Sequence, residues 1–164
     1  MLTQTSGTAI KALLFLTLNG TESPMSPREI AERIDASPTY LAKITRMLVK
    51  ADILRSHRGA HGGVVLSREP NQITLLQVVE ACQGLLIGNY CEGIRGHADP
   101  ICAFHEAMYE VHQATVGVLS RWTIQELADR AYAEHNGAVC RMKFELNAAN
   151  CDCIDTCENE KPGE

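Results

Sequence analysis

The stretch from residue 26 to residue 66 reads SPREIAERIDASPTYLAKITRMLVKADILRSHRGAHGGVVL, and it contains two helix starts of the same kind. Ser26 and Ser37 are each followed by proline, which suits the first position of a helix, and a serine side chain caps a helix start. Glu29 stands three residues after Ser26, which is the spacing of a capping box. The short break at residues 35–36 separates the two predicted helices, so the pattern indicates a helix-turn-helix.

The second half of this stretch predicts a β-hairpin. Apolar residues at positions 53–54 and 64–66 flank a basic, glycine-rich segment, as two short strands flank a turn. A helix-turn-helix with such a hairpin attached is a winged helix, whose second helix enters the major groove of double-stranded DNA. We therefore expect a mainly α-helical protein with a small β-wing that binds DNA.

The expected DNA contacts lie on the second helix and at the hairpin tip. Exposed residues at the start of the helix should read base edges in the major groove, whereas its later cations should contact phosphates. A glycine-rich tip allows close approach of the backbone, and an arginine there suits the negative potential of a narrow minor groove. The candidate residues are Ser37, Thr39, Tyr40, Lys43, Arg46 and Lys50 on the helix and Arg58, His61, Gly62 and Gly63 on the hairpin.

The charge of the chain is segregated, although its net charge is −5. From Ser37 to Arg68 there are six cations and a single anion, Asp52, whereas from Glu145 to the end there are six acids and a single cation, Lys161. Phosphate binding requires a local basic face rather than a basic protein. A solvated surface patch is the alternative, but the cations coincide with the second helix and the hairpin. This favours double-stranded DNA as a partner.

Helical periodicity continues on both sides of this stretch. A first core helix with apolar positions from Ala9 to Leu18 precedes it, and the capping box at residues 74–77 opens a further helix that ends before Gly84. A long helix from Ala103 has residues at alternating spacings of four and three, which is a heptad-like seam. A second subunit is the simplest cover for this seam, and packing within one chain is the alternative. The seam consists of Phe104, Met108, Val111, Thr115, Val118 and Trp122.

The chain divides into four predicted parts. They are a winged-helix domain with its supporting helix (1–84), a ligand-bearing loop (85–102), a dimerisation helix with the helix after it (103–135) and an acidic, cysteine-rich tail (136–164). No segment has the length and apolarity of a membrane span or the pattern of a signal peptide, so we expect a cytoplasmic protein without a membrane partner. Seven cysteines in a reducing compartment favour metal or redox chemistry over a disulfide framework.

Two cysteines and two histidines lie within fifteen positions around the start of the long helix. Cys102 and His105 are three residues apart and therefore project from the same helical face. Cys91 stands in the preceding glycine-rich loop, which can bring it toward that face, and His97 follows six residues later. Cysteine and histidine are ligands of both iron–sulfur clusters and zinc, so the spacing predicts a metal site without identifying the metal.

Five segments of the sequence form a specific combined pattern: SPTYL from Ser37, LVKADIL from Leu48, RGAHGG from Arg58, ITLLQVVE from Ile73 and CAFHE from Cys102. With this pattern, residues 1–133 resemble the IscR/NsrR family of winged-helix, iron–sulfur-sensing transcription regulators. The resemblance implies a homodimer, a cluster near the dimerisation helix and an operator affinity that follows redox, nitric oxide or iron status. It implies no enzymatic activity.

The resemblance matches Cys91 to the first cluster ligand of the family and Cys102 to the last, while His105 matches a histidine that some members use. The middle cysteine is absent. His97 stands at its distance from Cys91, although the gap from His97 to Cys102 is one residue short. Residues 4–8 contain neither the acidic residue nor the histidine that other members place on the first helix. A set of two cysteines and two histidines suits a [2Fe–2S] cluster better than a [4Fe–4S] cluster.

Two other functions remain open from the sequence. The same fold could sense through cysteine thiols or zinc without a cluster, whereas a metal- or thiol-dependent enzyme would need a catalytic motif that the sequence does not show. The C-terminal cysteines have no counterpart in the family, and their spacing is not a common zinc pattern. The alternatives for them are a second metal or cluster site, extra ligands that fold over the first site, a redox-labile tail or an inert arm. These cysteines are Cys140, Cys151, Cys153 and Cys157.

Overall fold

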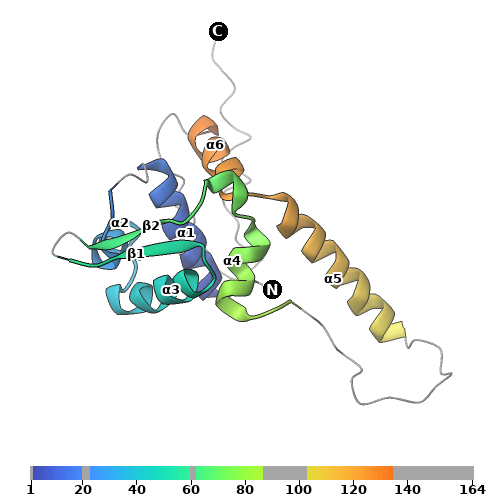
Figure 1. Cartoon of the computed structure of the whole chain (residues 1–164). Coiled ribbons are helices and arrows are strands. Elements are labelled where there is room, and N and C mark those ends of the chain that lie inside the picture. The colour runs from blue at the N-terminus through green and yellow to red at the C-terminus, as the bar shows by residue number, and fades with distance from the viewer. Residues whose placement is uncertain (1, 20–22, 60–61, 87–102, 135–164) are drawn as a thin grey trace, which may run out of the picture.

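The structure is a computed structural model that describes residues 2–19, 23–59, 62–86 and 103–134 (Figure 1). It is mainly α-helical with a small β-hairpin, as the sequence predicts. None of the described helices is long and apolar enough to cross a membrane. The elements are α1 (Gln4–Leu18), α2 (Pro27–Arg33), α3 (Pro38–Lys50), β1 (Leu54–His57), β2 (Gly63–Leu66), the 3-10 helix η1 (Pro70–Gln72), α4 (Leu75–Gln83), α5 (Ala103–Arg121) and α6 (Ile124–Glu134).

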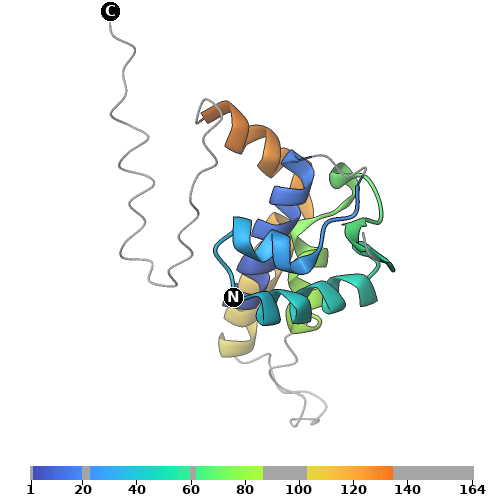
Figure 2. The same cartoon turned by 90° about the vertical axis from the view of Figure 1, so that its left-hand side faces the viewer.

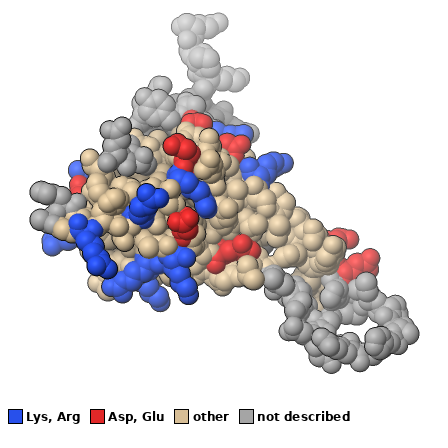
Figure 3. Space-filling model, in the orientation of Figure 1, with Lys and Arg blue, Asp and Glu red and all other residues tan. Residues whose placement is uncertain are grey.

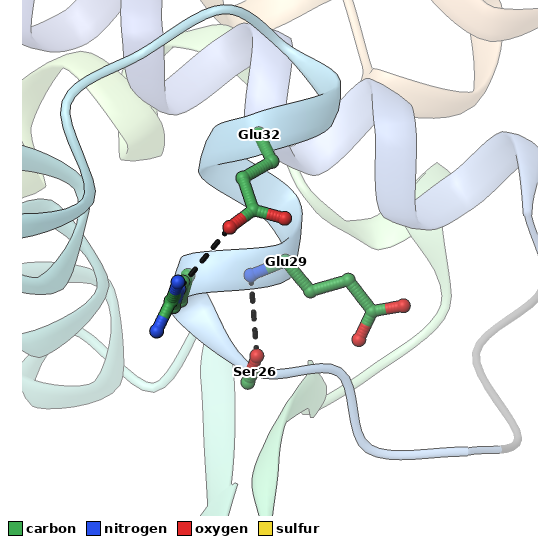
Figure 4. Close-up of polar contacts among 4 residues, drawn as sticks. Ser26, Glu29 and Glu32 are labelled. Atoms are coloured by element: carbon green, nitrogen blue, oxygen red, sulfur yellow. Dashed lines mark hydrogen bonds and ion pairs between the residues drawn. The ribbon is translucent and has the colours of Figure 1, made fainter.

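The two helices of the helix-turn-helix begin where the sequence predicts. Ser26 is the N-cap of α2, and its Oγ accepts a hydrogen bond from the Glu29 N–H at 3.2 Å. The Glu29 side chain points away from this cap (Figure 4), so only half of the capping box forms. Ser37 is the N-cap of α3 but makes no capping hydrogen bond with its side chain. Figure 4 also shows the ion pair of Arg28 with Glu32, at 3.1 Å, which contributes little because both side chains are exposed.

Both helices end in a sharp reversal in which an aspartate takes the left-handed conformation. Asp35 and Asp52 each have a φ of 55°. After Asp52 the Ile53 N–H donates to the Leu48 carbonyl oxygen at 2.9 Å, and the equivalent hydrogen bond after α2 is also 2.9 Å. This pattern is the Schellman motif, which satisfies carbonyl groups at a helix end. It turns the chain from α2 into α3 and from α3 into β1.

α1 is the central helix of the core. It contacts α2, α3, α4, α6 and β2, and Figure 2 shows it between α6 and α3. Leu13 of α1, Ile30 of α2, Ile44 of α3 and Val78 of α4 are fully buried in one cluster. Burial of each such side chain stabilises the fold by roughly 1.5–3 kcal/mol relative to exposure. The helix-turn-helix therefore has a fixed place on α1.

The wing is tied to the segment that leads into α2. β1 and β2 pair antiparallel, with His57 opposite Gly63. The Met25 N–H donates to the Val64 carbonyl oxygen at 3.1 Å, and the Val64 N–H donates to the Met25 carbonyl oxygen at 2.9 Å. A Cβ at Gly63 would lie 2.4 Å from the Met25 backbone, so only glycine allows β2 to approach the segment before α2 so closely.

α5 and α6 pack differently, although they are adjacent in the chain. Thr74, before α4, and Thr123, before α6, form an isolated β-bridge. The Glu126 carboxylate accepts the Thr123 N–H at 2.8 Å, and the hydrogen bonds from Thr123 lower the pKa of this carboxyl. Ile124 and Ala128 place the apolar face of α6 in the core around α1. α5 instead contacts α4 and projects from the molecule (Figure 1).

Gly63→Ala should lower the free energy of unfolding by about 1–3 kcal/mol, because the added Cβ would overlap the Met25 backbone. Urea denaturation followed by circular dichroism measures this change. Gly117→Ala is the control, since nothing lies within 4 Å of a Cβ at this position in α5. That variant should be as stable as the wild type or more stable, by up to about 1 kcal/mol. Equal stability of the two variants would contradict the close approach at Gly63.

Candidate nucleic-acid interface

α3 has one buried face and one exposed face. Leu41, Ile44 and Leu48 are fully buried, and α3 contacts α1. Residues of the exposed face recur at spacings of four, three and four, which places them along one side of the helix. Four of the residues expected to contact DNA therefore form one outward stripe. They are Thr39, Lys43, Arg46 and Lys50.

Positive charge gathers on this side of the molecule. Figure 3 shows Lys and Arg side chains over α3 and the wing. Within the described ranges the single ion pair joins Arg28 and Glu32 of α2, so no carboxylate neutralises Lys43, Arg46 or Lys50 there. A basic surface without internal counter-charges meets the electrostatic requirement for binding phosphates.

A groove of about 590 Å³ lies between α3 and the wing. Arg46 lines it from α3 and Arg58, which is exposed, lines it from the wing. The described residues around the groove include no carboxylate. The groove therefore joins the cationic stripe of α3 to the wing. Its other lining residues are Pro27, Ala42, Thr45 and Val49 on the helical side and Ser56, His57, Gly59, Gly62, Gly63 and Val64 on the wing side.

Tyr40 is half-buried, whereas its place at the start of the second predicted helix led us to expect an exposed side chain. Its side chain packs against the core, and its hydroxyl lies 2.8 Å from Oγ1 of Thr5 in α1. The ring thus fastens the first turn of α3 to the first turn of α1. Ser37 and Thr39, which precede Tyr40, are exposed, so they are better placed than Tyr40 to meet DNA.

The wing glycines have a role in the fold itself. A Cβ at Gly62 would lie 2.6 Å from the His57 carbonyl oxygen, and one at Gly63 would meet the backbone before α2. Their contact with DNA stays a prediction, as does that of His61, which lies outside the described residues. His57 lines the groove, although sequence reasoning did not single it out. Its position directly before Arg58 is the signal that could have identified it.

The predicted metal ligands fall mostly outside the described part of the chain. His105 is in the first turn of α5. No group of three or more His, Cys, Asp or Glu side chains is arranged to hold a metal ion among the residues that the structure describes. The metal site and the possible second site therefore stay predictions. The ligand candidates outside the described residues are Cys91, His97 and Cys102, and for the second site Cys140, Cys151, Cys153 and Cys157.

Cys82, near the end of α4, has the properties of a structural thiol. It is half-buried against the core, and burial raises the pKa of its thiol to about 11. The thiol is therefore protonated at neutral pH, whereas metal binding and nucleophilic attack require the thiolate. Cys82 does not belong to the proposed ligand set.

A helix-turn-helix held on α1, with a hairpin beside its second helix and a basic groove between them, is the arrangement of a winged-helix DNA-binding protein. The family of the chain follows from comparison with known proteins. The model of the Rrf2 family, described as an iron-dependent transcriptional regulator, matches residues 2–130. The chain belongs to the Rrf2 family, so it is a transcription regulator and not an enzyme.

Individual relatives agree with this assignment. The chain is 26% identical to the regulator IscR of Klebsiella pneumoniae (strain 342) over 149 residues, which cover 90% of this chain and 91% of IscR. It is 30% identical to NsrR of Geobacillus kaustophilus over 127 residues, or 75% and 86% of the two chains. The structure of CymR, the global cysteine regulator of B. subtilis, has a TM-score of 0.65 at 25% identity and covers 79% and 97%. T. potens IscR has a TM-score of 0.62 at 25% identity and covers 80% and 88%.

Arg58→Ala should weaken binding to a mixed-sequence DNA duplex and reduce the slope of log affinity against log salt by about one unit for each bound protomer, because one phosphate contact is lost. Fluorescence anisotropy titrations over a series of salt concentrations measure both quantities. Arg121→Ala removes an exposed positive charge from the last turn of α5 and should leave the slope unchanged. If Arg58→Ala keeps the wild-type slope, the wing does not make this contact.

Proposed function

We propose that this chain is a homodimeric transcription regulator whose affinity for a double-stranded DNA operator is controlled by an iron–sulfur cluster. The observation that carries the proposal is the basic surface of α3 and the wing, on a fold that also projects a long helix with exposed apolar residues (Figure 1). A regulator that binds an operator acts in the cytoplasm, and a reducing compartment also suits a chain with seven cysteines.

The exposed apolar side of α5 supports the homodimer. Val111 and Val118 lie seven residues apart on the predicted seam, so they share one face of the helix, and they are 48% and 50% exposed. Met108 and Trp122, which belong to the predicted seam, are half-buried. Exposed apolar side chains along a helix mark an interaction surface, and two α5 helices related by a two-fold axis would cover each other. Such a dimer presents two α3 helices, one for each half-site of an operator.

The cluster would be held by Cys91, His97, Cys102 and His105. Two thiolates and two imidazoles form a donor set that occurs at [2Fe–2S] centres, so we favour this cluster over [4Fe–4S]. His105 lies in the first turn of α5, and the positive end of a helix dipole stabilises the thiolate of a nearby cysteine. When bound, the cluster supplies a redox centre that responds to redox state, nitric oxide or iron supply.

The position of His105 suggests how such a site affects DNA binding. α5 carries this residue at its start and the exposed apolar residues along its length. A change in ligation at the start of α5 would therefore bias the packing of one subunit on the other. Because each subunit carries one α3, the spacing of the two recognition helices would shift between two populations.

The likeness to CymR favours a second candidate function. CymR is named as a cysteine regulator, and this chain aligns with 97% of it at 25% identity. In this candidate the same winged helix senses through cysteine thiols or zinc, without a cluster. Cys140, Cys151, Cys153 and Cys157 would supply further thiols for that chemistry, or a second metal or redox site beside the cluster.

Protein purified without oxygen should absorb visible light as an iron–sulfur protein and contain about two irons and two sulfides per protomer. Cys91→Ser should abolish both properties, because a ligand is lost. Cys82→Ser is the matched control and should retain them, because the raised pKa of Cys82 makes it a poor ligand. The loaded and metal-stripped forms should differ in duplex affinity. Colourless protein that contains zinc, or no metal, would contradict the cluster and support the second candidate.

A further inference from the structure

We propose that the groove between α3 and the wing holds one sugar–phosphate strand of the duplex, and that Ser56 and His57 contact its phosphates. This inference rests on the proposed DNA binding by α3 and the wing. A recognition helix in the major groove and a wing in the adjacent minor groove lie on opposite sides of the strand that separates the two. That strand must pass between α3 and the hairpin, where the groove of about 590 Å³ lies.

The groove has the chemical character that such a strand requires. Apart from Gly59, its exposed lining residues are polar or cationic, with Arg46 on α3 and Ser56, His57 and Arg58 on the wing. Less exposed lining residues, such as Ala42 and Val49, are small or apolar. A DNA strand also has a charged part and a less polar part, namely its anionic phosphates and its deoxyribose sugars. The cations at the exposed edge of the groove suit the phosphates, and the small or apolar residues deeper in the groove suit the sugars.

Ser56 and His57 have side chains that can meet a phosphate. Both are exposed at the end of β1, and neither makes a side-chain hydrogen bond to any residue within the described ranges. Ser56 stands opposite Val64 in the hairpin, and it is exposed although Val64 is buried. Thr45 differs, because it is buried and its hydroxyl donates to the Ala42 carbonyl oxygen at 3.0 Å.

His57 can contact a phosphate through its imidazole ring, because a ring N–H group is a hydrogen-bond donor. Among the described residues that line the groove, the charged side chains are Arg46 from α3 and Arg58 from the wing. A substitution of His57 leaves both arginines in place and therefore tests the contribution of His57 alone.

The first test compares full-length wild type with His57→Ala on a short mixed-sequence duplex, by fluorescence anisotropy at one salt concentration. His57→Ala should lower duplex affinity by about two- to tenfold, because a hydrogen-bond donor to a phosphate is lost. His57→Arg should keep the wild-type affinity or raise it, because a guanidinium also binds phosphate. His112→Ala removes a histidine from α5, away from the groove, and should behave as the wild type.

The second test places a negative charge in the groove. Ser56→Asp should lower duplex affinity by about tenfold or more, because a carboxylate would oppose a phosphate. Asn71→Asp adds the same charge to the exposed 3-10 helix η1, which contacts α6, and should change affinity little. Thermal unfolding close to that of the wild type establishes that each variant is folded.

The outcomes separate this inference from the proposed function. Equal duplex affinities of wild type and His57→Ala would overturn the His57 contact. Equal affinities of Ser56→Asp and Asn71→Asp would overturn the placement of the strand, even where Arg58→Ala confirms the wing contact. A wild-type protein that binds no duplex at low salt would instead overturn DNA binding by this surface, and the groove assignment with it.

Discussion

The burial of α1 fixes where the surrounding elements lie. α2, α3, α4, α6 and β2 all contact this helix, and its Leu13 is fully buried. A close-packed core fixes the positions of its helices relative to one another, since interdigitated side chains cannot slide past one another without loss of contact. Because α3 buries Leu41 and Ile44 in this core, its polar and cationic stripe lies on the opposite side of the helix and faces solvent. The orientation of the DNA-binding helix is thus a consequence of packing on the opposite side.

The wing depends on the same core for its place beside α3. A two-stranded hairpin is at best marginally stable alone in water. Here Leu54 and Leu66 at its base are buried, and the backbone bridge between Met25 and Val64 ties β2 to the segment before α2. Glycine at position 63 is what allows that bridge. These contacts keep the groove open at a defined width, so that α3 and the wing present one surface.

The sequence predicted the features that depend on neighbouring residues. Serine–proline pairs place the starts of α2 and α3, and glycines between apolar runs place the wing, because capping and turn formation involve only a few consecutive residues. Tyr40 shows the limit, since its hydroxyl meets Thr5, which is 35 residues away, and only the packing of α3 on α1 brings them together. His57 is a candidate for DNA contact because it lines the groove, and the groove depends on how α3 and the wing pack. The metal ligands stay predictions, because Cys91, His97 and Cys102 lie outside the described residues.

The central claim is that α3 and the wing act as a single DNA-binding surface held by the core around α1. An NMR titration of the full-length protein with a short duplex measures where DNA contacts the chain. We expect the largest changes in amide chemical shift along the exposed stripe of α3 and in the wing residues that line the groove, with small changes at Leu13 and elsewhere in the centre of α1. Changes confined to α5 and α6, with α3 and the wing unaffected, would contradict the claim.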